Sequence, residues 1–277
     1  MSQSLPTVAL LQMEYVFAFF EPEMFAAWPG PVEGISFEWD DDGSRFVEAV
    51  REKRIDIIIG NIPATAYDRI EKTAAQLESV RFIPSLETQR LNRSKEEVVL
   101  FCRKEGIAHP ETHIFHDMAE GEAWLQHAHY PQVIRRSYGP SNYGGYHSHL
   151  VHTAEEARAV IKEQKCTPLF VQKPVQMRHN AEFRVILMEH KPLHSYWYCN
   201  ETPGALSVDE APQEAIELAI EVSRAADAPY IICSIAVDEA TGEALLLECA
   251  TGFAAAPELR STIAGHIVGQ LLNDSKG

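Results

Sequence analysis

The chain has 277 residues, 45% of them hydrophobic, with 24 Lys and Arg against 40 Asp and Glu and a formal net charge of −16. That length is ample for a buried core and for about two domains. The negative charge argues against a general binder of nucleic acid or of anionic membranes, because both need a basic surface. Any anion site must therefore be a local pocket that works against the overall field.

The sequence predicts a cytoplasmic protein. Residues 1–7 are mostly polar and lack the basic and apolar regions of a signal peptide. No apolar run approaches the roughly 20 residues that cross a bilayer. The five cysteines are scattered without CxxC spacing, which is typical of free thiols in a reducing compartment and not of a disulfide frame or a zinc site.

The first part of the chain predicts a small parallel α/β unit. Apolar strands are expected at 7–13, 55–64 and 80–86, and a helix with one apolar face at 44–54. Open sheets of this kind bind ligands beyond the carboxyl ends of their strands, which makes the Gly60–Asn61 turn a candidate substrate edge. A plain tight turn is the alternative, and it is the one we favour.

The rest of the chain alternates capped helices with strands. Ser94 can cap a helix that ends at Gly106, and Thr153 with Glu156 forms a capping box. The other expected elements are, in order, a strand at 112–115, a helix at 118–128, strands at 168–175 and 181–199, a helix at 211–228, a hairpin at 230–253 and a helix at 257–272. The segment 181–199 is expected to be a hairpin that turns at His190–Lys191.

The stretch "PQVIRRSYGPSNYGGYHSHLV", residues 131–151, places cations before a flexible loop. An apolar strand ends on Arg135 and Arg136, and a loop with three glycines follows. Such a loop lets backbone N–H groups close over phosphate oxygens, and cations at the strand end neutralise the same phosphates. Taken alone, a solvated hairpin with two surface arginines is the more ordinary interpretation.

The order of the other motifs favours the phosphate-binding interpretation over the surface hairpin. A lysine stands at the start of a helix; "VIRRSYG" and the glycine loop follow; an apolar strand ends in "VQKPV"; the next strand carries "EFRVIL"; and the last hairpin ends in "LLLECATGF". From about Leu91 to Phe253 this order resembles the ATP-grasp ligases, especially their RimK-like and D-alanine–D-alanine-ligase-like branch.

The resemblance implies an α/β fold with an N-terminal parallel-sheet (pre-ATP-grasp) domain and a two-lobed ATP-grasp body. The N-terminal domain would span 1–90. The small lobe, with the glycine-rich loop, would span 91–172, and the C-terminal lobe, with the metal and phosphate site, 173–277. ATP would lie between the two lobes.

The resemblance also assigns phosphate-binding residues. Lys95 corresponds to the family's first phosphate lysine, and Arg135 stands at its strand-end cation. Arg184 corresponds to the arginine that reaches the phosphate or acyl-phosphate, with Glu182 at the usual aspartate. The loop residues that would cover the phosphates are Gly139, Ser141, Gly144 and Gly145. Each cation has an ordinary alternative: Lys95 as a solvated helix lysine, Arg184 as an ion pair with Glu182.

The hinge strand that hydrogen-bonds adenine in the family corresponds to Gln172–Val175. Lys173 occupies the usual acidic position, so adenine would be recognised by backbone groups of Lys173 and Val175. A plain core strand is the alternative.

The metal motif departs most from the family. Glu248 corresponds to the family's Mg²⁺ carboxylate, but Ala250 stands where asparagine is usual and Ser234 where an aspartate is usual. Asp238 lies four residues further, near an expected turn, and we do not count it as a ligand. Either metal binding is rearranged or this is an ATP-binding fold with reduced catalysis.

Other candidate residues give weaker evidence of a functional role. The histidines of "YHSHLVH" (His147, His149, His152) do not share one strand face, which argues against a metal site. Cys249 has no fixed histidine partner and is interpreted as an ordinary buried thiol. Asn200, in the segment 197–204, either touches substrate or only makes the turn.

The resemblance thus implies an ATP-dependent carboxylate–amine ligase that forms an amide or peptide bond through an acyl-phosphate. Arg184 and Arg135 would be the catalytic residues, ATP and Mg²⁺ the cofactors, and a small carboxylate and an amine (an amino acid or peptide) the substrates; a homo-oligomer is possible. One alternative is a catalytically weakened, ATP-binding pseudo-ligase that acts as a sensor or partner subunit. Another is a two-domain binding protein that takes no nucleotide.

Overall fold

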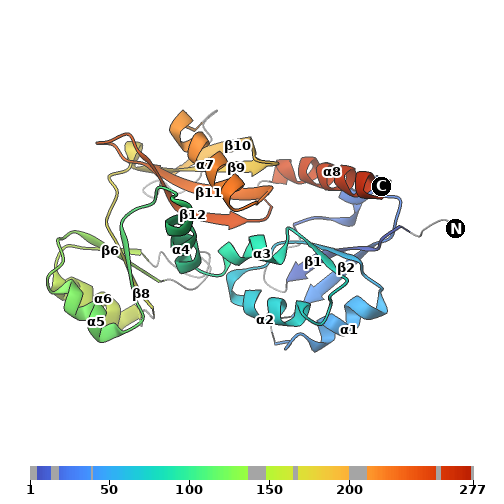
Figure 1. The fold of residues 1–277 in the computed structure, drawn as a ribbon, viewed down its shortest axis with the longest axis horizontal. Helices are drawn as coiled ribbons and strands as arrows, with labels where there is room; N and C mark the ends of the chain where they lie inside the picture. Colours follow the sequence, from blue (N-terminus) through green and yellow to red (C-terminus); the bar gives the residue numbers. More distant parts are fainter. Residues whose placement is uncertain are drawn as a thin grey trace.

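The computed structural model describes residues 5–13, 19–38, 40–136, 148–164, 168–199, 211–253 and 257–275. Within these ranges the chain forms three sheets of four strands each, with helices packed against them (Figure 1). The fold is α/β, as the sequence predicts, with one parallel and two antiparallel sheets.

The N-terminal sheet is parallel, with strand order β2-β1-β3-β4. Its short central strand is buried at every residue because both faces of the sheet are covered. One face packs on α1 and α2, and the other on η1 and the C-terminal helix α8. The elements are β1 (Val8–Met13), η1 (Pro22–Phe25), β2 (Val32–Phe37), α1 (Ser44–Glu52), β3 (Ile57–Ile59), α2 (Ala64–Ala74), β4 (Arg81–Ile83), α3 (Leu86–Gln89) and η2 (Arg90–Asn92).

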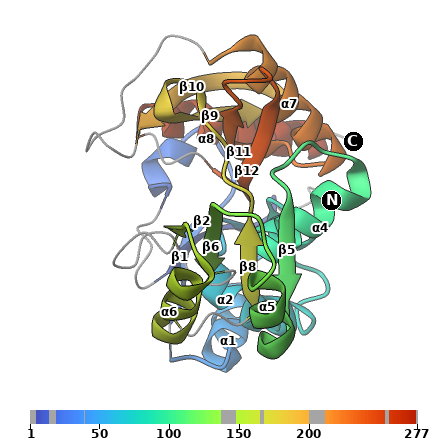
Figure 2. The same ribbon diagram turned by 90° about the vertical axis from the view of Figure 1, so that its left-hand side faces the viewer.

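The second sheet is antiparallel, with strand order β5-β8-β6-β7, and forms the small lobe. Two helices cover one of its faces, and Figure 2 shows this lobe lying below the C-terminal sheet. The other face carries Arg135 and Ser148, which are partners in register. The elements are β5 (Thr112–Phe115), α5 (Met118–Leu125), β6 (Gln132–Arg136), β7 (Ser148–Val151), α6 (Ala154–Gln164) and β8 (Leu169–Gln172).

The third sheet is antiparallel, with strand order β10-β9-β11-β12. Helices α4 and α7 bury one face, and α8 with the N-terminal domain covers part of the other. Helix α4 therefore packs in this core although it lies within 91–172; where the domains divide remains a prediction. The elements are α4 (Lys95–Glu105), η3 (Arg178–Asn180), β9 (Ala181–Met188), β10 (Lys191–Cys199), α7 (Gln213–Ala225), β11 (Tyr230–Val237), β12 (Ala244–Thr251) and α8 (Pro257–Asp274).

Most local expectations are confirmed. The Ser94 hydroxyl accepts the backbone N–H of Glu97 and caps α4. The Thr153 hydroxyl accepts the N–H of Glu156, whose carboxylate accepts the N–H of His152. The hairpin between β9 and β10 turns one residue earlier than expected, at Glu189–His190, where both residues have positive φ (52° and 59°).

Two asparagine side chains from the N-terminal part of the chain hydrogen-bond to the backbone at the C-terminal end of β12. The Asn92 amide donates to the Thr251 carbonyl and accepts the Thr251 N–H, both at 2.8 Å. The Asn61 amide makes the same pair of contacts with the backbone of Phe253, at 3.3 and 2.8 Å. Asn61 is thus used in the fold, which favours the structural interpretation of the Gly60–Asn61 turn.

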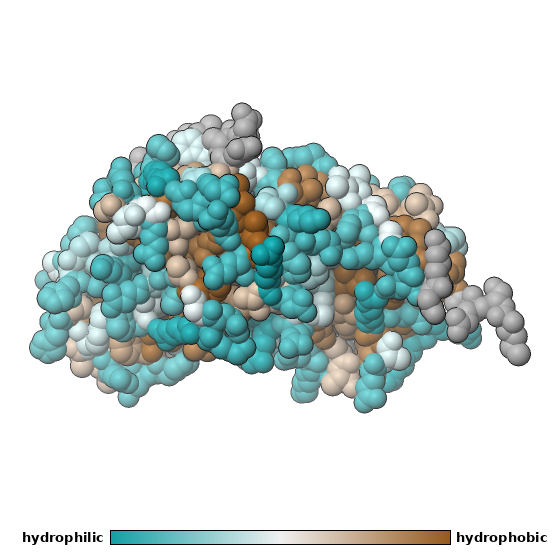
Figure 3. Space-filling model, turned by 45° about the horizontal axis from the view of Figure 1, so that its top comes forward, coloured by the Kyte–Doolittle hydropathy of each residue, from teal (hydrophilic) through white to brown (hydrophobic). Residues whose placement is uncertain are grey.

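The surface agrees with the acidic composition. Hydrophilic residues cover most of the face shown in Figure 3, with smaller hydrophobic areas between them. In the described part of the chain no helix has the length and apolar character needed to cross a membrane.

Candidate functional site

Three residues of the C-terminal sheet form one cross-strand row. Ser234 on β11 pairs with Arg184 on β9 and with Glu248 on β12. Directly opposite residues of antiparallel strands share a face, so the three side chains project together. The neighbouring pair Cys233–Cys249 lies on the opposite face, in the core with α7. The row therefore projects away from α7.

Both carboxylates of this region are paired with cations. Glu182 lies two residues before Arg184 on the same face, and its Oε1 lies 2.9 Å from Arg184 Nε and 2.8 Å from Arg184 Nη2. Lys95 comes from the first residue of α4, and its Nζ donates to Glu248 Oε1 at 3.0 Å. The structural alternative for Arg184, an ion pair with Glu182, is therefore present.

Arg135, on the small lobe, is subject to the charges of the same two carboxylates. Its Nε donates to Ser148 Oγ at 2.9 Å, across the strands that flank the glycine-rich loop. Burial lowers the pKa of Arg135, and the charges of Glu248 and Glu182 oppose that change. The charges of Arg135 in the small lobe and of Arg184 on β9 thus both act on Glu248.

The pKa of Glu248 is lowered by the charges of three cations. Burial would raise its pKa, but Lys95, Arg135 and Arg184 together outweigh burial and hold the pKa of Glu248 below its usual range. For Arg184 burial would lower the pKa, and Glu182 with Tyr196 outweighs it. Glu248 is therefore ionised at neutral pH and surrounded by cations.

The local balance of charge is positive in a chain whose overall balance is strongly negative. Lys95, Arg135 and Arg184 contribute three positive charges against the two negative charges of Glu182 and Glu248. Such a pocket attracts an anion, and arginine suits phosphate and carboxylate because its planar fork binds two oxygens at once.

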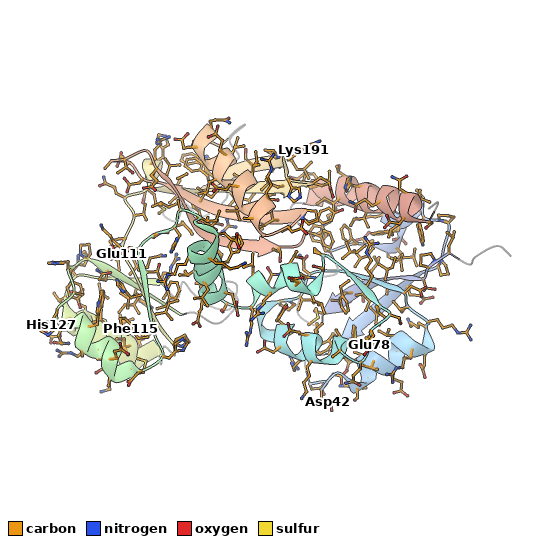
Figure 4. The ribbon with its side chains drawn as sticks, in the orientation of Figure 1. Asp42, Glu78, Glu111, Phe115, His127 and Lys191 are labelled. Carbon is orange, nitrogen blue, oxygen red and sulfur yellow. The ribbon has the colours of Figure 1, made fainter. Side chains whose placement is uncertain are left out.

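The predicted adenine hinge follows β8. The buried Gln172 side chain donates to Thr112 Oγ1 at 3.1 Å, and the backbone N–H of Lys173 donates to the Glu111 carbonyl at 2.8 Å. Glu111 stands just before β5, at the edge of the small lobe (Figure 4). Recognition of adenine would then fall to the carbonyl of Lys173 and to Val175. It remains a prediction.

The predicted phosphate loop lies outside the described residues. Gly139, Ser141, Gly144 and Gly145 all fall in 137–147. The structure describes only the strand ends on either side, Arg136 and Ser148.

The donor set does not fit Mg²⁺ held by protein carboxylates. Mg²⁺ needs oxygen ligands, but Glu248 is paired with Lys95, and the neighbouring Ser234 and Ala250 bring no carboxylate. Asp238 accepts three hydrogen bonds in the β11–β12 turn, from Ala240 and Thr241. Among the described side chains no three of His, Cys, Asp or Glu gather in a way that could hold a metal.

The described cysteines have a structural role. Cys102, Cys233 and Cys249 are buried together in the core beneath α7. Burial raises the pKa of Cys102 to about 12 and that of Cys249 well above its usual value. This supports the buried-thiol interpretation of Cys249. His147 and Asn200 lie outside the described residues.

Sequence reasoning missed the partners that hold these side chains. Ser148 fixes Arg135, and Thr112 fixes Gln172. A signal for Ser148 was available, because a hairpin that opens after Arg135 brings the first residue of its return strand opposite it. No pattern in the neighbouring sequence predicted the contacts of Thr112 or Asn92.

Three solved structures are similar to this chain over nearly its whole length. The L-amino acid ligase of Bacillus licheniformis has 13% identity and a TM-score of 0.66, over 96% of this chain and 71% of that one. An ATP-grasp RimK domain protein of Sphaerobacter thermophilus has 15% identity and a TM-score of 0.66, over 96% and 99%. The D-alanine–D-alanine ligase of Bacillus anthracis, solved with ATP, has 13% identity and a TM-score of 0.63, over 97% and 95%.

No protein-family model matches the chain, and no curated protein sequence matches it. The structural likenesses show that the chain has the ATP-grasp fold, as the motif order predicts. At these identities they show the fold alone, and the function has to be argued from the site.

Proposed function

We propose that this chain is an ATP-dependent carboxylate–amine ligase that works through an acyl-phosphate. One observation carries the proposal: Lys95 of α4 pairs with Glu248, and the charges of Arg135 on β6 and Arg184 on β9 lower the pKa of the same carboxyl group. A triphosphate placed there would be contacted from both lobes at once. The fold is shared with ligases of amino acids, which supports an amino acid or peptide as substrate.

The proposed reaction has two steps. A substrate carboxylate oxygen attacks the γ-phosphorus of ATP, the bond from that phosphorus to the bridging oxygen breaks, and ADP leaves. The amine nitrogen then attacks the acyl carbon. The bond from that carbon to the bridging oxygen breaks, inorganic phosphate leaves with this oxygen, and the nitrogen loses a proton. No protein nucleophile is needed, so positioning and electrostatic stabilisation carry the rate.

The residues have distinct roles in this proposal. Arg184 contacts the transferred phosphoryl group and the acyl-phosphate, and Arg135 holds the triphosphate from the small lobe. Lys95 leaves Glu248 to contact phosphate oxygens. The loop with Ser141, Gly144 and Gly145 closes over the phosphates as a lid, and Lys173 and Val175 recognise adenine through their backbone.

The test is ADP release over a panel of amino acids, alone and in pairs, followed by mass spectrometry of the products. We expect ADP release that depends on a carboxylate and an amine, with an amide as product. Arg184→Met should lower kcat/KM by about tenfold or more, because it removes a charged contact to phosphate. Arg224→Met, near the end of α7, is the control and should leave turnover unchanged.

The pseudo-ligase is the second candidate, and Ser234 and Ala250 favour it because the usual metal-ligating side chains are missing there. Calorimetric titration with ATP separates the two functions. Binding without turnover over the whole panel would support a nucleotide sensor and contradict the ligase. Absence of binding would contradict both and favour a binding protein that takes no nucleotide.

A further inference from the structure

Among the residues that the structure describes, the two carboxylates of the site, Glu182 and Glu248, are each paired with a cation of the chain. Glu248 Oε1 lies 3.0 Å from Lys95 Nζ, and Glu182 Oε1 lies 2.8 Å from Arg184 Nη2. A Mg²⁺ ion bound to either carboxylate would break an ion pair and then lie beside the released cation. Such repulsion is stronger where water is partly excluded, and the exposed fractions are 21% for the Lys95 side chain and 18% for Glu182, against 45% for Glu248 and 36% for Arg184.

The positions around Glu248 do not compensate for this. Ser234 is its register partner on β11, and Ala250 lies two residues further along β12, on the same face. Ser234 offers a neutral hydroxyl and Ala250 a methyl group, so neither position adds a carboxylate, the protein group through which Mg²⁺ is usually held.

The same arrangement suits a polyanion well. Lys95, Arg135 and Arg184 outnumber the two carboxylates, and Arg135 is held by the neutral Ser148 hydroxyl. Glu248 keeps the Lys95 ammonium in the pocket while no anion is bound, and a phosphate oxygen can replace the carboxylate as its partner.

We infer that this chain, if it binds ATP as proposed above, neutralises the triphosphate with Lys95, Arg135 and Arg184 and not with Mg²⁺ held by protein carboxylates. Glu248 is then the counter-ion that positions Lys95. Side chains of the chain then supply the positive charge that a protein-bound metal would supply.

The first test needs no variant. The full chain is titrated with ATP by calorimetry, once in excess EDTA and once in excess Mg²⁺. The inference predicts that the Kd in EDTA is less than about tenfold weaker than the Kd with Mg²⁺. A loss of tenfold or more on removing the metal overturns it. Absence of binding in both buffers overturns the proposed function itself, so the two failures are distinguishable.

The second test separates a counter-ion from a metal ligand. In EDTA, Glu248→Gln should bind ATP more tightly than the wild type, because it removes a negative charge beside the phosphates and frees Lys95. If Glu248 held a metal, the variant would bind more weakly with Mg²⁺, and that result overturns the inference. Glu243→Gln, exposed in the β11–β12 turn, is the matched control and should match the wild type.

The third test concerns the ammonium group. Lys95→Met should weaken ATP binding in EDTA by about tenfold or more, because a charged contact to phosphate is lost. Lys104→Met is its control, since Lys104 lies near the other end of α4 with its side chain 80% exposed. Equal binding by the two variants overturns the inference. A melting curve for each variant shows that it is folded before binding is compared.

Discussion

The ammonium of Lys95, at the start of α4, lies 3.0 Å from the carboxylate of Glu248, which stands 153 residues later on β12. This contact joins a helix start to the C-terminal sheet at the point where Arg135 of the small lobe also acts on Glu248. The site is therefore assembled by tertiary folding, and its parts can be tested one by one.

The ionised form of Glu248 should stabilise the fold in a pH-dependent way. Lys95, Arg135 and Arg184 hold its pKa below the usual range against the effect of burial. The stability gap between the wild type and Glu248→Gln should therefore be full at neutral pH and shrink on acidification below about pH 4.3, the usual glutamate pKa. Urea unfolding across this range measures it. A gap that grows with acid would contradict the account.

Gly252 should be intolerant of a side chain. Its φ is +147°, and a Cβ there would lie 2.1 Å from Asn61 Oδ1, which accepts the N–H of Phe253. Gly252→Ala should cost about 1–3 kcal/mol of unfolding free energy from the backbone conformation alone, with the clash in addition. Thermal and urea unfolding report the change.

Gly265 gives the matched control for that substitution. It lies exposed inside α8, and a Cβ there would meet nothing within 4 Å. Gly265→Ala should stabilise the protein by about 0.5–1 kcal/mol, because alanine restricts the unfolded chain more and favours helix. Effects of the same sign at both glycines would be evidence against the assigned role of Gly252.

The Asn92 amide should contribute to holding the segment before α4 against β12. Asn92→Ala leaves the N–H and carbonyl of Thr251 without their side-chain partner, which should cost about 1–3 kcal/mol. Asn273→Ala, exposed near the end of α8, should change stability by less than about 0.5 kcal/mol. Equal unfolding midpoints for the two variants would show that the Asn92 contact contributes nothing.

The three core cysteines should be unreactive in the folded protein. Burial raises the pKa of Cys102 to about 12, and Cys233 and Cys249 are buried beside it. Because the thiolate is the reactive form, iodoacetamide at neutral pH should leave all three unmodified until denaturant is added. Peptide mapping by mass spectrometry identifies the modified residues. Rapid modification of Cys249 in the native protein would revive its interpretation as a nucleophile.

Local signals in the sequence were sufficient for most elements. Ser94 and Thr153 predict helix starts correctly, because each hydroxyl accepts the backbone N–H of a residue only three positions away. Strand β2 (Val32–Phe37) was not predicted, since Glu33 and Gly34 interrupt its apolar pattern and the strand lies at the sheet edge, where only two of its residues are buried. Edge strands carry a weak pattern for this reason.

The residues of the candidate site could be proposed from the sequence, and so could the local Arg184–Glu182 ion pair, but not the contact between Lys95 and Glu248. The motif order selected Lys95, Arg184 and Glu248. Their pairing depends on how α4 packs against β12, and no spacing in the sequence encodes that. The contacts of the Asn61 and Asn92 amides could not be predicted for the same reason, because each acts on backbone more than 150 residues away.

The central claim is that a triphosphate lies among Lys95, Arg135 and Arg184, between the small lobe and the C-terminal sheet. A crystal structure of the chain with a non-hydrolysable ATP analogue, grown with Mg²⁺ present, tests it most directly. We expect phosphate oxygens within hydrogen-bonding distance of all three cations, with Lys95 moved from Glu248 onto a phosphate. A nucleotide bound elsewhere, or phosphates that leave both arginines untouched, would contradict it.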